Sequence, residues 1–177
     1  MRLRSRAVLA VPVASLVAAS GAPPAAAPAE PSPSQKTFTT LLLDDAGTSA
    51  GVKRLLRTKA GFVDPRSGFV DVTGDGRQDA LVLVSTGGAA GDVALYVFST
   101  HGQAASDKQT QLKVLFGLQS LYRATLRVSG TTISVTEPLY APGEDLCCPA
   151  KVRTRDYGFD PAHLTFVRTD DRTLDAP

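Results

Sequence analysis

Short apolar runs separated by turn-forming residues follow one another through most of the chain from residue 69 onward. The runs are rich in valine, leucine and aromatic residues, and glycine, proline, serine or aspartate bounds them, which is typical of β-strands. Short connections between strands favour antiparallel pairing. The expected strands cover residues 69–72, 80–85, 93–99, 112–118, 122–128, 131–137, 152–159 and 164–167.

Residues 37–61 carry a weaker pattern. They fit either a short helix that is capped by Ser49 and ends at Gly61, or an edge strand over residues 52–58. The apolar face of the helix would hold Val52, Leu55, Leu56 and Lys59. We favour the helix, so the sequence predicts an α+β fold that is mostly antiparallel β-sheet with one short helix.

The first 29 residues have the composition of a secretory signal peptide. Arg2, Arg4 and Arg6 precede an apolar run over residues 7–19, and small residues follow that run. The run is shorter than the roughly 20 apolar residues that a membrane-spanning helix needs. We therefore expect export, and a secreted or cell-envelope location.

Cleavage of the signal is expected after Ala29, with residues 18–20 as the alternative site. Residues 30–36 are rich in proline, alanine and serine and are expected to form a linker. The remainder, residues 37–177, is long enough for one β-rich extracytoplasmic domain with a core of its own and too short for two.

The charge of the expected mature chain is close to balanced. Loss of the three signal arginines leaves 16 basic and 17 acidic residues. A basic patch that would attract nucleic acid or an anionic membrane is therefore not expected. We expect an extracellular or envelope ligand as the partner, no nucleic acid, and no stable membrane insertion after cleavage.

The strongest chemical pattern is the segment Asp-Val-Thr-Gly-Asp-Gly-Arg-Gln-Asp over residues 71–79. Oxygen donors at alternate positions converge on a hard cation such as Ca²⁺ when a glycine at position six lets the chain turn, and Gly76 stands there. The alternative is a tight turn whose aspartates cap backbone amides without a metal. The candidate ligands are Asp71, Thr73, Asp75, the Arg77 carbonyl and Asp79.

The only two cysteines, Cys147 and Cys148, are adjacent. An oxidising compartment permits a disulfide between them, although a bridge between neighbours departs from ordinary disulfide geometry. Two free thiols, an interchain bridge, or a soft-metal site completed by His101 or His163 are the alternatives. The vicinal disulfide is the favoured prediction.

The aspartate segment and the apolar strand that follows it resemble the loop and strand of FG-GAP and VCBS-type repeats. The resemblance implies a calcium loop between two strands. Only one copy is present, whereas a propeller needs several blades, so the likeness is confined to the loop. Thr73 stands where such loops more often carry Asn or Asp, which implies weaker binding.

A second resemblance covers residues 52–167 and is to a family of actinobacterial secreted proteins and lipoproteins of unknown function. It implies a role outside the cytoplasm and no particular activity. The motifs that carry it are the Asp-Val-Thr-Gly-Asp-Gly loop, Thr86-Gly87-Gly88, Gly91-Asp92-Val93 and Cys147-Cys148-Pro149.

The sequence contains no hydrolase elbow, zinc-protease helix motif or phosphate-binding loop. It therefore favours a non-catalytic binding or structural module of the cell envelope that calcium stabilises. The alternative is a thiol-active or soft-metal-binding protein centred on the cysteine pair.

Overall fold

The computed structural model describes residues 31–64, 68–103 and 111–176, so the predicted signal peptide lies outside the described residues. Two helices precede nine strands. The helices are α1 (Pro33–Asp44) and α2 (Ala50–Arg57), and the strands are β1 (Phe62–Val63), β2 (Gly68–Val70), β3 (Asp79–Ser85), β4 (Asp92–Ser99), β5 (Lys113–Gln119), β6 (Thr125–Ser129), β7 (Thr132–Leu139), β8 (Lys151–Asp160) and β9 (Thr165–Asp175).

The strands form two antiparallel sheets. Sheet A has five strands in the order β1-β3-β4-β5, with β2 also paired to β3, and sheet B has the order β6-β7-β8-β9. Every strand pair in both sheets is antiparallel. The predicted fold class, mostly antiparallel β with few helices, is confirmed, and each expected strand has an observed counterpart. The two-residue β1 was not predicted.

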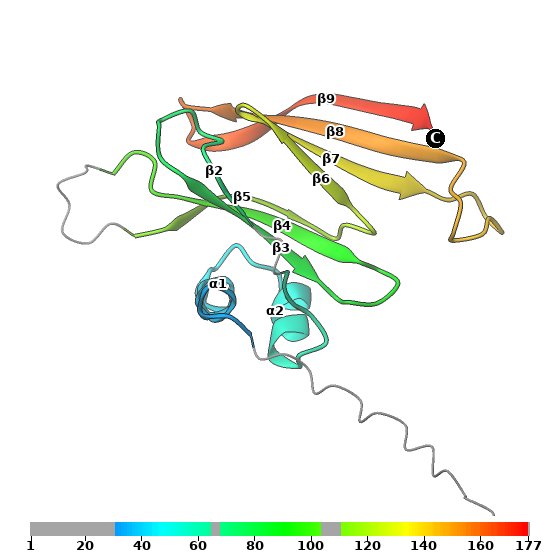
Figure 1. The fold of residues 1–177 in the computed structure, drawn as a ribbon, viewed down its shortest axis with the longest axis horizontal. Helices are drawn as coiled ribbons and strands as arrows, with labels where there is room; N and C mark the ends of the chain where they lie inside the picture. The colour runs from blue at the N-terminus through cyan, green and yellow to red at the C-terminus, as the bar shows by residue number, and fades with distance from the viewer. Residues whose placement is uncertain (1–30, 65–67, 104–110, 177) are drawn as a thin grey trace, which may run out of the picture. The chain divides into compact units, whose positions relative to one another are not determined.

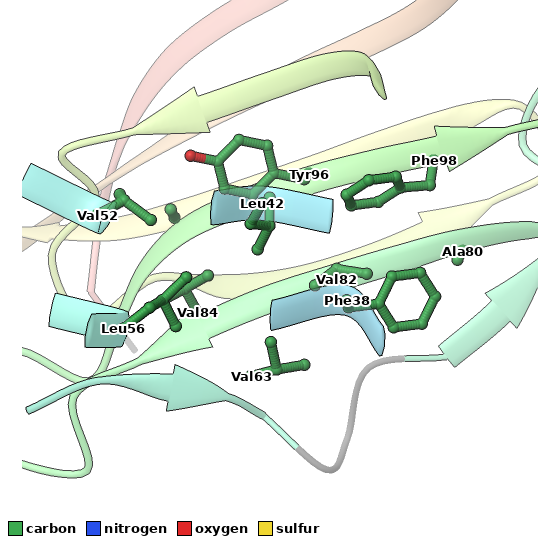
Figure 2. Close-up of a cluster of buried hydrophobic side chains, with 11 residues drawn as sticks. Phe38, Leu42, Val52, Leu56, Val63, Ala80, Val82, Val84, Tyr96 and Phe98 are labelled. Carbon is green, nitrogen blue, oxygen red and sulfur yellow. The ribbon is translucent and has the colours of Figure 1, made fainter. Parts of the chain in front are cut away.

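The two helices and the two sheets pack as three layers, with sheet A between the helices and sheet B (Figure 1). One core cluster joins the helices to sheet A (Figure 2), and a second cluster joins sheet A to sheet B. The first contains Phe38 and Leu42 of α1 against Val82 and Tyr96 of sheet A. The second contains Leu95 of sheet A and Ile133 of sheet B.

The central strands β3 and β4 are apolar on both faces because both faces are covered. Successive side chains of a strand point to opposite faces. In β3, Val82 and Val84 point to the helices, whereas Leu81 points to sheet B. In β4, Tyr96 points to the helices and Val97 points to sheet B. Their sequences therefore lack the polar alternation that a strand with one wet face shows.

Helix α1 overturns part of the expected linker. It begins at Pro33, so residues 33–36 belong to the folded domain and the domain begins before residue 37. Ser32 and Gln35 form a capping box, in which each side chain accepts a hydrogen bond from the other residue's backbone amide. Pro33 occupies the first turn, where its missing amide hydrogen has no cost. The proline that suggested a linker therefore starts a helix.

Helix α2 matches the favoured prediction for residues 37–61, and the alternative edge strand over residues 52–58 was wrong. Ser49 is its N-cap, and the Ser49 hydroxyl accepts the Val52 amide. Val52 and Leu56, one helical turn apart, are buried against sheet A. Among the described residues, no helix has the length and apolar character needed to cross a bilayer.

Because Leu42 is fully buried between α1 and sheet A, we expect Leu42→Ala to lower the free energy of unfolding by about 2–5 kcal/mol. The matched substitution Lys36→Ala, on the exposed side of the same helix, should change it by less than about 0.5 kcal/mol. Urea unfolding of both variants measures this difference. Equal effects would mean that α1 does not form part of the core.

Candidate functional site

The aspartate loop, residues 71–79, joins β2 to β3 as the sequence predicted. The two strands pair antiparallel up to Val70 and Asp79, so the loop reverses the chain. Gly74 and Gly76 have positive φ angles of 76° and 81°, in a backbone region that residues with a Cβ atom adopt only with strain. Gly76 therefore turns the chain at the position where the ligand pattern requires a glycine.

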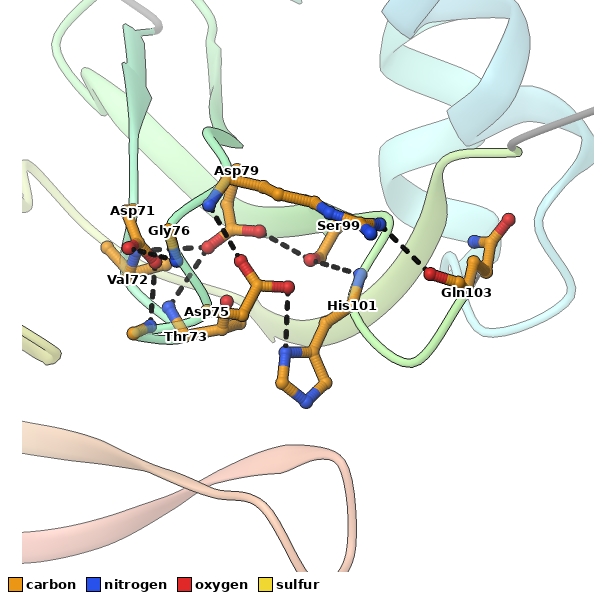
Figure 3. A network of polar contacts seen from close by, with 11 residues as sticks. Asp71, Val72, Thr73, Asp75, Gly76, Asp79, Ser99, His101 and Gln103 are labelled. Carbon is orange, nitrogen blue, oxygen red and sulfur yellow. Dashed lines mark hydrogen bonds and ion pairs between the residues drawn. The ribbon is translucent and has the colours of Figure 1, made fainter. Parts of the chain in front are cut away.

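The Asp71 carboxylate is organised by the backbone of its own loop. Oδ1 accepts the Gly74 amide at 2.7 Å, and Oδ2 accepts the Gly76 amide at 2.8 Å (Figure 3). Burial alone would raise the pKa of Asp71, but the amides of Gly76 and Gly74 lower it below its ordinary value. Asp71, the first candidate ligand, is therefore ionised, and it lies where the loop begins.

Thr73 carries a buried hydroxyl that is poorly satisfied. The residue is only 8% exposed, and its Oγ1 makes no hydrogen bond of good geometry within the described part of the chain. The carboxylate of Asp71 lies beside it, and a weak contact from the hydroxyl is among the causes that lower the pKa of Asp71. A buried hydroxyl without a good partner is unfavourable by up to about 1–3 kcal/mol, so a ligand or a water at this position would stabilise the loop.

Asp75 connects the loop to the connection after β4 and, through it, to sheet B. Its Oδ1 accepts the Arg77 amide at 2.9 Å, and its Oδ2 lies 3.0 Å from Nδ1 of His101 (Figure 3). The His101 ring in turn packs edge-on against Phe159 of β8, with the ring centroids 5.0 Å apart. Asp75 and His101 therefore tie the aspartate loop to both sheets.

Asp79 is 1% exposed and acts as a structural cap. Its Oδ2 accepts the amides of Val72 and Thr73 at 2.9 and 3.0 Å. Its Oδ1 accepts the hydroxyl of Ser99, which is itself 1% exposed and stands at the end of β4. The Ser99 oxygen also accepts the His101 amide at 2.9 Å. This carboxylate therefore joins the start of the loop, its end and the neighbouring strand.

The structure brings together part of the predicted ligand set. Asp71 and Thr73 face each other, whereas the carboxylate of Asp79 is committed to amides and to Ser99. The side chain of Arg77 reaches away and donates to the carbonyl of Gln103 at 3.0 Å. No group of three or more His, Cys, Asp or Glu side chains among residues 31–64, 68–103 and 111–176 is arranged to hold a metal ion. The amide caps match the alternative reading of the loop as a capped turn.

The pairing of Asp75 with His101 also resembles the orienting half of a catalytic triad, and Ser99 is close in sequence. Ser99 is buried, however, and its hydroxyl donates to Asp79 and not to the imidazole. A nucleophilic serine needs its proton directed at the base and its oxygen open to substrate. The arrangement of these three residues is therefore structural.

The cysteine loop, residues 140–150, joins β7 to β8. Cys147 and Cys148 are both exposed. His101 packs against Phe159, and His163 pairs with Asp160 at 2.7 Å. Both contacts lie where β8 ends, whereas the cysteines precede the start of β8. The expected vicinal disulfide stays a prediction.

The aspartate loop and the cysteine loop lie at opposite ends of the sandwich (Figure 1). The aspartate loop leads into the start of β3, and a Cβ atom on Gly74 would lie 3.2 Å from Thr131 in the β6–β7 turn. At the far end of β3, Arg123 donates its amide to Ala90 at 2.7 Å and its guanidinium to the carbonyl of Leu146. A seven-residue strand spans about 20 Å, so the two motifs form separate sites.

In comparisons with known proteins, the chain matches no protein-family model, no curated protein and no solved structure. The resemblances drawn from its motifs therefore stay predictions.

Sequence reasoning missed the partners that hold the loop. Ser99 and His101 lie 20 and 26 residues beyond the aspartates that they contact. The available signal was their position, with Ser99 at the end of the apolar strand 93–99 and His101 two residues beyond it. Adjacent antiparallel strands bring the end of one beside the start of the next.

Because Asp79→Ala would leave two buried amides and the Ser99 hydroxyl without an acceptor, we expect it to lower the free energy of unfolding by about 3–5 kcal/mol. Asp79→Asn retains an acceptor for the amides and should lose less. Asp71→Ala should lose about 1 kcal/mol or less, because water can reach the amides that it exposes. Urea unfolding in chelator ranks the three variants, and an Asp79→Ala loss no larger than that of Asp71→Ala would contradict the structural role.

Proposed function

We propose that this protein is an exported, non-catalytic binding or structural module of the cell envelope, and that its aspartate loop binds Ca²⁺. The observation that carries the calcium proposal is the poorly satisfied Thr73 hydroxyl, which is 8% exposed, lacks a hydrogen bond of good geometry and lies beside the carboxylate of Asp71. A neutral oxygen and a carboxylate oxygen at alternate positions of a tight loop are the donors that a hard cation needs.

The ligand set that fits the structure is smaller than the set that the spacing predicted. Asp71, Thr73 and Asp75 would supply side-chain oxygens, and the Arg77 carbonyl would supply a backbone oxygen. Asp79 keeps its amides and Ser99, and so positions the loop without contacting the ion. Binding would require Asp75 to exchange its contact with His101 for the cation.

Such a site would bind calcium weakly. The ion would compete with hydrogen bonds that the carboxylates of Asp71 and Asp75 already accept from backbone amides. Extracellular modules work with dissociation constants of about 10⁻⁴–10⁻³ M, and the signal-like residues 1–29 favour that setting. The site therefore suits an exported protein better than a cytoplasmic one.

The expected role of the cation is to stabilise the fold. The loop contacts the β4–β5 connection through His101 and the β6–β7 turn through Gly74. An ion bound there would hold the ends of both sheets together. The buried, structurally engaged Ser99 and the turn position of His163 favour a module that binds or supports over one that catalyses.

We expect Ca²⁺ at about a hundredfold over its dissociation constant to stabilise the protein by about 2.7 kcal/mol and to raise its melting temperature by about 5–10 °C. The measurement is a thermal melt of the protein in chelator and then in millimolar Ca²⁺. Asp71→Ala should abolish the rise, and Asp175→Asn, an exposed aspartate outside the loop, should leave it unchanged.

Thr73→Val provides the sharper test because it keeps the shape of the side chain and removes only the hydroxyl. In chelator the variant should be as stable as the wild type or more stable, since the lost hydroxyl makes only a weak contact with Asp71. In Ca²⁺ its melting temperature should rise less than that of the wild type. A wild type that melts at the same temperature with and without Ca²⁺ would refute the proposed site.

A further inference from the structure

The cysteine loop is held at its base and at its tip by other residues. Glu144 accepts the amide of Ala141 at 2.7 Å and the amide of Ala150 at 2.5 Å, and so closes the loop across its two ends. At the tip, the carbonyl of Leu146 accepts the hydroxyl of Tyr140 at 2.9 Å and also the guanidinium of Arg123. The residue directly before the two cysteines is therefore fixed to the sandwich.

The two thiols project from this fixed loop into solvent. Both cysteines are exposed, and the Cys148 amide donates to the carbonyl of Asp145 at 3.2 Å, which forms a turn under the pair. The Cys148 thiol donates a hydrogen bond to the neighbouring Cys147 sulfur, and this bond, with some burial, raises the pKa of Cys148. The two sulfur atoms therefore lie close together, and Cys148 holds its proton more tightly than an isolated thiol does.

We propose that Cys147 and Cys148 form a thiol–disulfide exchange site whose substrates are disulfides outside the cytoplasm. The Cys147 thiolate attacks one sulfur of the substrate, which forms a mixed disulfide and releases the first substrate thiolate. Cys148 then loses its proton and attacks Cys147, which forms the Cys147–Cys148 bond and releases the second thiolate. The two cysteines together lose two electrons, and the substrate disulfide gains them and is reduced to two thiols.

The surroundings of the pair favour exchange over metal binding. A zinc site needs four ligands, and no cluster of three or more metal-ligating side chains includes these cysteines within the part of the chain that the structure describes. Exchange needs only an accessible thiolate and a resolving thiol. This site lies at the other end of the sandwich from the aspartate loop, so it stands or fails independently of calcium.

The test is to incubate the reduced protein with oxidised glutathione and to follow its intact mass and its reaction with an alkylating reagent. We expect the protein to lose two hydrogen atoms in mass, to lose both alkylatable thiols and to retain no glutathione. Persistent glutathione adducts, disulfide-linked dimers or two thiols that stay reactive would overturn the proposal.

Two experiments test the order of attack. Cys148→Ser should accumulate an adduct of one glutathione on Cys147, because the resolving thiol is gone. Brief alkylation of the reduced wild-type protein should label Cys147 before Cys148, because the Cys147 sulfur holds the proton of the Cys148 thiol. Equal labelling of the two cysteines, or labelling of Cys148 first, would overturn the assignment of Cys147 as the attacking thiol.

A further pair of variants distinguishes a built site from two cysteines that are merely adjacent. Glu144→Gln weakens the closure of the loop and should slow formation of the Cys147–Cys148 bond severalfold. Asp145→Asn makes the same chemical change at the next residue and should leave the rate unchanged. If Glu144→Gln and the urea-unfolded chain both close the ring as fast as the folded wild type, the loop contributes nothing and the site is not a built one.

Discussion

The burial of β3 and β4 on both faces is the constraint on which the rest of this structure depends. Val82 and Val84 point to one side and Leu81 to the other, and β4 is divided in the same way. Each buried valine or leucine side chain contributes about 1.5–3 kcal/mol when it is removed from water. A sheet with two such faces needs a cover on each, so the helices and sheet B follow from the sequence of these two strands.

The same strand pair positions the aspartate loop. Asp79 is both the first residue of β3 and the last of the loop, and Ser99 ends β4 beside it. A carboxylate this deeply buried is tolerated only when donors satisfy it, and the amides of Val72 and Thr73 with the Ser99 hydroxyl do so. The geometry of the loop is therefore set by residues of the core. For this reason Asp79, which the spacing predicted to be a cation ligand, instead anchors the loop to the core.

The elements that could be predicted are those whose signal is local. β3, β4, the Ser49 cap of α2 and the turn at Gly76 each express a short-range rule of periodicity, capping or backbone conformation. Helix α1 was missed because its proline-rich start resembles a linker, although Ser32 and Gln35 have the spacing of a capping box. Composition and capping point to opposite conclusions there, and burial of Phe38 and Leu42 decides between them.

The second half of β9 was missed for a different reason. Residues 168–175 are mostly charged or polar, which argues against a strand when the segment is read alone. In the structure they pair with β8, and cross-strand ion pairs satisfy them: Arg153 with Asp171, and Arg172 with Asp156. The contact with Arg153 lowers the pKa of Asp171. Hydrogen bonds from Ser134 and Arg172 lower the pKa of Asp156. Partners this far apart in sequence become visible only once the register is fixed.

The hydrogen bonds of the aspartate loop also set the strength that any cation site there can have. In the absence of an ion, the Asp71 carboxylate accepts hydrogen bonds from two amides, and the Asp75 carboxylate contacts one amide and His101. The loop is therefore already closed, and an ion would gain only the difference between its own contacts and those that it displaces. Each displaced hydrogen bond offsets about 0.5–1.5 kcal/mol of binding. A domain whose core is complete without metal needs no tight site, and the proposed calcium site would add stability only where calcium is abundant.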